Sequence, residues 1–163
     1  MSNRKWLWLE DELSSVSDIR NYMERNSIDF ETFSNFDDFY IKLVELKNAK
    51  KLNEYGLILD IKIDAMRFVP IPKEWSGKNE YKSIPIQSEV NNTGLVFYEE
   101  AIVEYAKEFW KPLPPVIFLS TVLESVFRSD LDRIRAKAGS DRFVFIRKWD
   151  YDTSSFLSNL KEW

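Results

Sequence analysis

Short apolar runs with no polar alternation recur along the chain, and polar or charged residues follow each of them. Runs of this length suit parallel strands that are buried on both faces of a sheet. The stretch 28–32 alternates instead, as a half-exposed edge strand does. The run 55–61 is the most informative one for function, because the carboxylate of Asp60 lies near its end. The predicted strands are 6–9, 28–32, 55–61, 116–119 and 143–146.

Between these runs, hydrophobic residues recur every three or four positions, which is the period of amphipathic helices. Asn35 is the predicted N-cap of the second helix, which we expect to run to about Asn53. The third helix is expected to start near Thr93-Gly94, and Gly139 to close the fourth as a C-terminal cap. The predicted helices cover about 13–23, 36–53, 93–109, 127–138 and 153–162.

Five strands alternating with five helices predict one α/β domain over residues 1–163, built on a doubly wound parallel sheet. We expect the flavodoxin-like strand order 2-1-3-4-5, with helices on both faces of the sheet. The segment 64–92 interrupts this pattern, and we expect it to form an inserted hairpin arm of 67–71 and 82–86 without a helix. Trp75 and Trp163 lie outside the predicted strands and helices and are candidate partner contacts.

Composition narrows the function classes. The 163 residues are 44% hydrophobic and 31% charged, as in an ordinary globular protein, and the net charge of −4 without a basic run argues against a nucleic-acid surface. The absence of cysteine and histidine excludes disulfides, thiolate and imidazole metal sites, and a role as a histidine kinase. No stretch approaches the roughly 20 apolar residues of a membrane span or resembles a signal peptide, so we expect a cytoplasmic protein.

Polar side chains from four strand ends meet at one edge of the predicted sheet. The order places Glu10 and Asp11 beside Asp60, with Ser120 and Lys148 nearby. Three crowded carboxylates repel one another, and a hard divalent ion such as Mg²⁺ would offset that repulsion. The Lys148 ammonium and the Ser120 hydroxyl suit phosphoryl oxygens, and Asp60 suits a nucleophile that attacks phosphorus to give an acyl phosphate.

Each of these residues, taken alone, also suits a structural role. Asp60 can serve as a turn or capping residue, and Lys148 as a solvated lysine at a strand end. The acidic turn 10–12 favours the start of a helix, and Ser120-Thr121 can cap the helix that follows. Their joint placement at one sheet edge favours the chemical interpretation.

Five fragments occur in the order and at the strand ends that are typical of the receiver domain of two-component response regulators, which the chain resembles. The resemblance covers the chain apart from 64–92 and the terminal residues. The fragments are Leu9-Glu10-Asp11, Leu57-Ile58-Leu59-Asp60, Asn92-Thr93-Gly94-Leu95, Pro115-Val116-Ile117-Phe118-Leu119-Ser120, and Ala138-Gly139-Ser140-Asp141 followed by Phe145-Ile146-Arg147-Lys148.

The resemblance implies a role for each site residue. Asp60 would accept a phosphoryl group from a phosphohistidine on a histidine kinase or histidine phosphotransfer protein. Glu10, Asp11, Asp60 and the backbone carbonyl of Lys62 would hold Mg²⁺, and Lys148 would contact the phosphoryl group. The chain would be a signalling phosphoacceptor whose only reactions are its own phosphorylation and dephosphorylation.

The resemblance also implies how the signal leaves the domain. Ser120 would turn toward the phosphoryl group and Phe145 would move inward behind it. A stand-alone receiver would then pass the signal to a downstream protein by contact, through the face of helix four, strand five and helix five or through the 64–92 insertion. Formation of a homodimer is left open.

Several residues depart from the family pattern. Trp149 stands where the family has a proline, and Thr121 is larger than the residue usual after the switch hydroxyl. Lys62 lies two residues beyond Asp60, where we expect its side chain to reach a phosphoryl group and to alter how long that group survives. The 64–92 insertion begins directly after the site and can cap it or serve as a docking arm.

Two other functions compete with this interpretation. The first is a receiver-like interaction module that works without phosphorylation, which the departures at Trp149 and Thr121 favour. The second is a Mg²⁺-dependent phosphohydrolase or nuclease that uses the same carboxylates. Against the second, Asp60-Ile61-Lys62 lacks the second aspartate that aspartate-nucleophile phosphatases use as acid and base.

Overall fold

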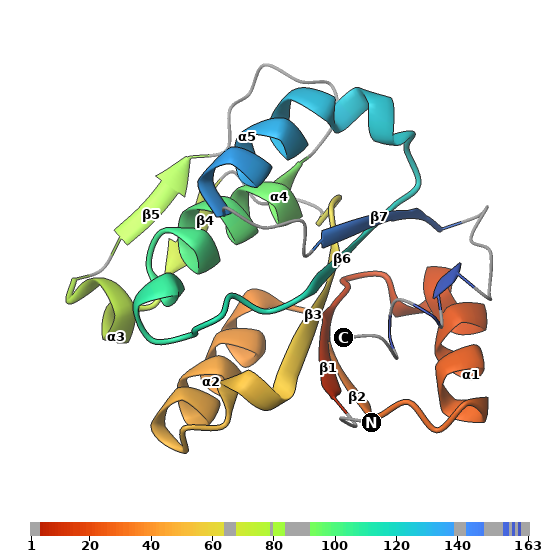
Figure 1. Ribbon diagram of the computed structural model, residues 1–163, viewed down its shortest axis with the longest axis horizontal. Helices are drawn as coiled ribbons and strands as arrows, with labels where there is room; N and C mark the ends of the chain where they lie inside the picture. Colours follow the sequence, from red (N-terminus) through yellow and green to blue (C-terminus); the bar gives the residue numbers. More distant parts are fainter. Residues whose placement is uncertain are drawn as a thin grey trace.

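The computed structural model describes residues 4–63, 68–78, 80–83, 92–138 and 143–148, together with residues 155, 156, 158 and 160. A five-stranded parallel sheet runs through the middle of the protein in the order β2-β1-β3-β6-β7 (Figure 1). Counting only the strands of this sheet, that is the predicted order 2-1-3-4-5. Its strands are β1 (Lys5–Leu9), β2 (Phe30–Phe33), β3 (Tyr55–Asp60), β6 (Val116–Ser120) and β7 (Phe143–Arg147).

The apolar runs form the inner strands because both faces of the sheet are covered. Nearly every residue of β1, β3 and β6 is buried, whereas the edge strands β2 and β7 are mostly half-buried. Trp6 and Trp8 pack toward α1 (Ser17–Arg25) on one face, and Leu57 and Leu59 pack toward α2 (Phe36–Asn48) on the other. The doubly wound arrangement is therefore confirmed.

The second helix ends earlier than predicted. The side chain of Asn35 accepts a hydrogen bond from the Asp38 N–H at 2.9 Å, which confirms the predicted cap. The helix stops at Asn48, not about Asn53, because Lys50 takes a left-handed φ of 57° and the Lys51 N–H donates to the Leu46 carbonyl. Such a Schellman-type ending satisfies the last carbonyls of a helix.

The helices of the second half are more irregular than their periodicity predicts. Within residues 92–138, only α4 and α5 are α-helical over several residues, and 3₁₀ or π turns adjoin them. The segments are α4 (Thr93–Phe97), a π-helical stretch η3 (Tyr98–Val103), the 3₁₀ turns η4 (Ala106–Glu108) and η5 (Glu124–Phe127), and α5 (Arg128–Ala138). Gly139 lies outside the described residues.

The segment 64–92 contains the predicted antiparallel hairpin, which we call the arm, together with a helix that was not predicted. Strand β4 (Phe68–Ile71) pairs antiparallel with β5 (Glu80–Ser83), and α3 (Lys73–Ser76) lies between them. The second strand begins at Glu80, not Lys82, and residues 84–91 lie outside the described part. Trp75 is half-buried and packs edge-on against Tyr40 and Phe109, and its role as a partner contact stays a prediction.

The predicted last helix, 153–162, is described at only four positions, and these are helical. Phe156 and Leu160 are buried in the cluster on the α1 side, while Leu157 and Trp163 lie outside the described residues. No helix among the described residues has the length and apolar character needed to cross a membrane.

Candidate functional site

The acidic side chains that were predicted to meet do meet at the carboxyl edge of the sheet. Glu10 and Asp11 follow β1, Asp60 ends β3, and these two strands pair in parallel with Leu9 opposite Leu59. One oxygen from each of the three carboxylates lies within 4.8 Å of the others. Glu10 is fully buried and Asp60 is 2% exposed, so little water screens their charges.

Lys148 places a positive charge directly against two of these carboxylates, Glu10 and Asp60. Its Nζ lies 2.8 Å from Glu10 Oε2 and 3.1 Å from Asp60 Oδ1, and the residue is buried. The chain reaches this point because the Lys148 N–H donates to the Ser120 carbonyl at 2.8 Å, beside the paired strands β6 and β7.

Burial and crowding shift the ionisation of all three groups. Burial and the neighbouring Glu10 charge raise the pKa of Asp60 to about 8, although Lys148 opposes the shift. Burial also raises the pKa of Glu10. Burial alone would lower the pKa of Lys148, but the charges of Asp60 and Glu10 outweigh it and the pKa is raised. The carboxylates therefore carry more negative charge than the ammonium of Lys148 alone neutralises.

The donor set fits a hard divalent cation. Three carboxylates from two adjacent strand ends supply the oxygen ligands that Mg²⁺ prefers, and it needs few protein ligands because it keeps several waters. The Lys62 N–H faces Asp60 Oδ1 at 3.4 Å, so the turn after β3 folds back on this carboxylate. The Lys62 carbonyl stays a predicted ligand.

The two predicted switch residues lie close to this edge in different settings. Ser120 is buried, and its Oγ accepts a hydrogen bond from the Val122 N–H at 3.0 Å within the turn after β6. It does not cap the helix that follows, because η5 begins at Glu124 with Leu123 as its N-cap and without a side-chain cap. Phe145 is half-buried and its ring packs 6.1 Å from that of Phe127 below α5. Their movement on phosphorylation stays a prediction.

Gly94 allows α4 to begin directly on the backbone of the site. Its N–H donates to the Ile61 carbonyl at 2.9 Å. A Cβ at this position would lie 2.0 Å from the carbonyl oxygen of Asp60, a distance that no side chain tolerates. The close approach of the Asp60 carbonyl to the backbone of residue 94 therefore requires a glycine at this position.

A charge network that sequence reasoning missed joins this region to α5. Glu99, which is 4% exposed in the π-helical stretch, binds Arg133 through bonds of 2.8–2.9 Å and Lys137 at 2.6 Å. Although burial opposes it, these cations lower the pKa of Glu99. Arg133 also binds Asp130 at 2.7 Å, and Asp130 accepts from Asn92 at 3.4 Å. The one sequence signal for this network was the four-residue spacing of Arg133 and Lys137, which places both cations on the same side of a helix.

Comparison with known proteins identifies the fold. No family model matches the chain, and no curated protein resembles it in sequence. Among solved structures, chemotaxis protein CheY4 of Vibrio cholerae is 12% identical, with a TM-score of 0.54 over 98% of this chain and 97% of that one. A response-regulator signal receiver domain from Bermanella marisrubri is 13% identical, with a TM-score of 0.52 over 99% and 98%.

A response-regulator receiver protein from Sinorhizobium medicae is 12% identical, with a TM-score of 0.51 over 98% of this chain and 92% of that one. These likenesses extend over nearly the whole chain. The protein therefore has a flavodoxin-like α/β fold, and within that class it has the fold of CheY-like receiver domains.

Proposed function

We propose that the protein is a signalling receiver that takes a phosphoryl group onto Asp60 from a phosphohistidine of a histidine kinase or histidine phosphotransfer protein. One observation carries the proposal: Asp60 ends β3 among Glu10, Asp11 and Lys148, at the sheet edge where receiver folds carry their acidic site. The carboxylates would hold Mg²⁺, which when bound supplies positive charge for the phosphoryl oxygens.

The transfer joins the phosphohistidine of the donor to the groups at this edge. A carboxylate oxygen of Asp60 forms a bond to phosphorus while the phosphorus–nitrogen bond of the phosphohistidine breaks. The electron pair of that bond leaves on the imidazole nitrogen, which takes up a proton from water. Lys148 then exchanges its contact with Asp60 for a phosphoryl oxygen, and Ser120 exchanges its bond with the Val122 N–H for another.

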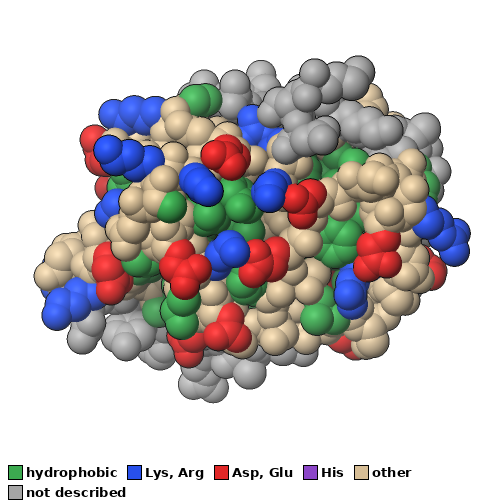
Figure 2. Space-filling view, turned by 90° about the horizontal axis from the view of Figure 1, so that it is seen from below, with side chains coloured by type: hydrophobic (Ala, Val, Ile, Leu, Met, Phe, Trp, Pro, Cys, Tyr) green, Lys and Arg blue, Asp and Glu red, His purple; other side chains and the backbone are tan. Residues whose placement is uncertain are grey.

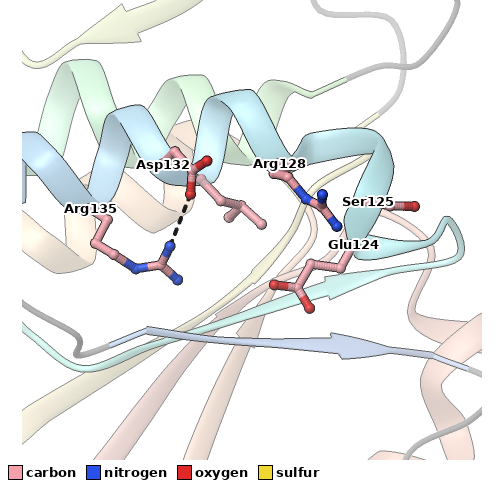
Figure 3. Close-up of a pocket in the computed structure, with 6 residues that line it drawn as sticks. Glu124, Ser125, Arg128, Asp132 and Arg135 are labelled. Atoms are coloured by element: carbon pink, nitrogen blue, oxygen red, sulfur yellow. Dashed lines mark hydrogen bonds and ion pairs between the residues drawn. The ribbon is translucent and has the colours of Figure 1, made fainter.

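We place the output surface on α5, β7 and the predicted helix at 153–162. A cavity of about 180 Å³ lies under α5, and Figure 3 shows Glu124, Arg128 and Arg135 reaching from η5 and α5 toward the strands below. Leu123 is 55% exposed beside it, and Val126 is also exposed. A movement of Phe145 beneath Phe127 would change this cavity, so we expect a downstream protein to dock there.

One observation favours the competing function, a receiver-like module that signals by contact without phosphorylation. Asp60 is 2% exposed and already holds the ammonium of Lys148, so a donor must displace that contact to react. In such a module, Asp60→Asn would leave partner binding intact.

Intact mass spectrometry with Mg²⁺ and acetyl phosphate or phosphoramidate separates the two functions. We expect one added phosphoryl group on the wild type and none on Asp60→Asn. If Mg²⁺ binds but neither protein gains mass, the phosphoacceptor function is wrong and the contact-only module stands.

A further inference from the structure

A groove lies between α2 and the arm, on a surface far from the acidic site. Its floor is apolar, formed by Tyr40, Ile41 and Val44 of α2 together with Pro72 of the arm. Its volume is about 280 Å³. This is below the roughly 300–1,000 Å³ of sites for drug-sized ligands, so the groove suits inserted side chains more than a cofactor.

Ile41 is the most exposed of the large hydrophobic residues described. It is 58% exposed on the outer face of α2, although its apolar neighbours in the groove, Tyr40, Val44 and Pro72, are partly or fully buried. An isolated exposed isoleucine is ordinary, but one that borders an apolar groove is typical of interaction sites.

The rim of this groove is acidic. Glu45 and Glu74 line it, and no basic residue does. Among the described residues neither of these carboxylates has an ion-pair partner, while Lys42 is paired with Glu31 at 2.7 Å. Figure 2 shows acidic side chains gathered around exposed hydrophobic ones over α2.

The nearby Lys47 does not neutralise the rim. Its Nζ lies 4.2 Å from the centre of the Phe109 ring and donates to the Glu74 backbone carbonyl at 3.4 Å. The residues that line the groove therefore carry only negative charge, which favours positively charged partners.

The groove is also preformed. The Tyr40 hydroxyl donates to the Pro70 carbonyl, and Trp75 packs edge-on against Tyr40 and Phe109 with ring centroids 5.9 and 5.5 Å apart. Val69 and Ile71 of β4 are buried in the core. A partner would not have to order this surface, which lowers the cost of binding.

We propose that this groove binds a basic amphipathic helix of a partner protein. Ile41, Val44, Glu45 and Asn48 follow one side of α2 over two turns, so a helix laid along α2 would place apolar residues into the groove at i, i+3 and i+4 spacing. Lysine or arginine on its flanks would meet Glu45 and Glu74. The site is independent of Asp60 chemistry and lies on a different face from α5 and β7.

The test titrates the full-length protein with three synthetic helical peptides and follows its NMR signals. One peptide has leucines flanked by lysines, the second has glutamate in place of lysine, and the third has serine in place of leucine. We expect only the first to bind and to shift the signals of Ile41, Val44 and the Trp75 indole. Because a buried isoleucine contributes strongly, Ile41→Ser should weaken binding about 10- to 100-fold.

Two further variants make the assignment specific. Glu45→Lys combined with Glu74→Lys should weaken binding about tenfold at low salt, because it reverses the charge of the rim. Leu123→Ser removes a leucine of similar exposure, 55% against 58%, from another face and should leave binding unchanged. Asp60→Asn should also leave it unchanged, which separates this site from the proposed phosphoacceptor.

Several results would overturn the proposal. These are no binding of the basic peptide at about 1 mM, equal binding of the acidic peptide, or binding that Ile41→Ser does not weaken. Shifts of Ile41 that depend on protein concentration without peptide would assign the groove to a second copy of the chain instead.

Discussion

Replacing Asp60 with asparagine should stabilise the folded protein at neutral pH while it removes the proposed phosphoacceptor. The pKa of Asp60 is raised from 3.8 to about 8, chiefly by burial and then by Glu10. The folded protein therefore keeps a proton that the unfolded chain has already lost. The stabilising effect of that proton is complete below pH 3.8 and is lost as the pH rises through about 8.

The size of the stabilisation follows from the pH range between the two pKa values of Asp60, 3.8 in the unfolded chain and about 8 in the folded protein. Each pH unit between the two pKa values lowers the free energy of unfolding by about 1.4 kcal/mol, so the loss reaches about 4 kcal/mol at pH 7. Asparagine cannot ionise, but it also weakens the contact that the ionised fraction of Asp60 makes with the Lys148 ammonium at 3.1 Å. We expect a net gain of about 1–3 kcal/mol at pH 7, which vanishes near pH 4.

Urea unfolding between about pH 4 and pH 8 tests this reasoning, with the fluorescence of the buried tryptophans Trp6, Trp8 and Trp110 as the readout. The wild type should lose stability relative to Asp60→Asn as the pH rises. Asp132→Asn is the control, because that aspartate is exposed and paired with Arg135 at the surface. A difference between wild type and Asp60→Asn that does not change with pH would refute the assignment of the buried proton to Asp60.

Three other changes test the surroundings of the site. Gly94→Ala should destabilise the protein by about 3 kcal/mol or more, since its Cβ would lie 2.0 Å from the Asp60 carbonyl oxygen, and urea unfolding measures the loss. Glu99→Gln should cost about 1–3 kcal/mol in the same assay, because Arg133 and Lys137 lose the carboxylate they share. Addition of Mg²⁺ should raise the melting temperature of the wild type, and more at pH 8 than at pH 6, because the ion competes with the proton on Asp60.

Each of these has a control on the same chain. Gly77→Ala introduces a side chain at φ 75° with nothing within 4 Å of its Cβ, so it should cost only about 1 kcal/mol. Glu104→Gln removes a surface ion pair to Lys107 and should change stability by less than about 1 kcal/mol. The site geometry would be contradicted if Gly94→Ala destabilised the protein no more than Gly77→Ala, or Glu99→Gln no more than Glu104→Gln. It would also be contradicted if Mg²⁺ raised the melting temperature of Asp60→Asn as much as that of the wild type.

The sequence was most informative where burial decides the structure. The runs at β1, β3 and β6 have no polar alternation because both faces of those strands are covered, so their positions and the residues after them could be predicted. The meeting of Glu10 and Asp60 followed from parallel pairing, which brings the carboxyl ends of adjacent strands to one edge.

Features that depend on distant pairings could not be predicted. The hydrogen bonds of Arg133 to Glu99 join residues 34 apart in the chain, and they require the π-helical stretch that periodicity does not reveal. The end of α2 depends on a left-handed φ at Lys50, a residue with no special preference for it. The short helix α3 was not predicted, and its Trp75 packs on Tyr40 and Phe109, which lie far away in the sequence.

The burial that raises the pKa of Asp60 also ties cation binding to the proposed chemistry. With a pKa of about 8, only about one-tenth of Asp60 is ionised at pH 7, and a protonated carboxylic acid is a poor nucleophile. A divalent cation among Glu10, Asp11 and Asp60 favours the ionised form, so loading the site displaces the proton that would otherwise block attack. Phosphorylation measured without a cation should therefore rise with pH toward 8, whereas with saturating Mg²⁺ it should change little over the same range.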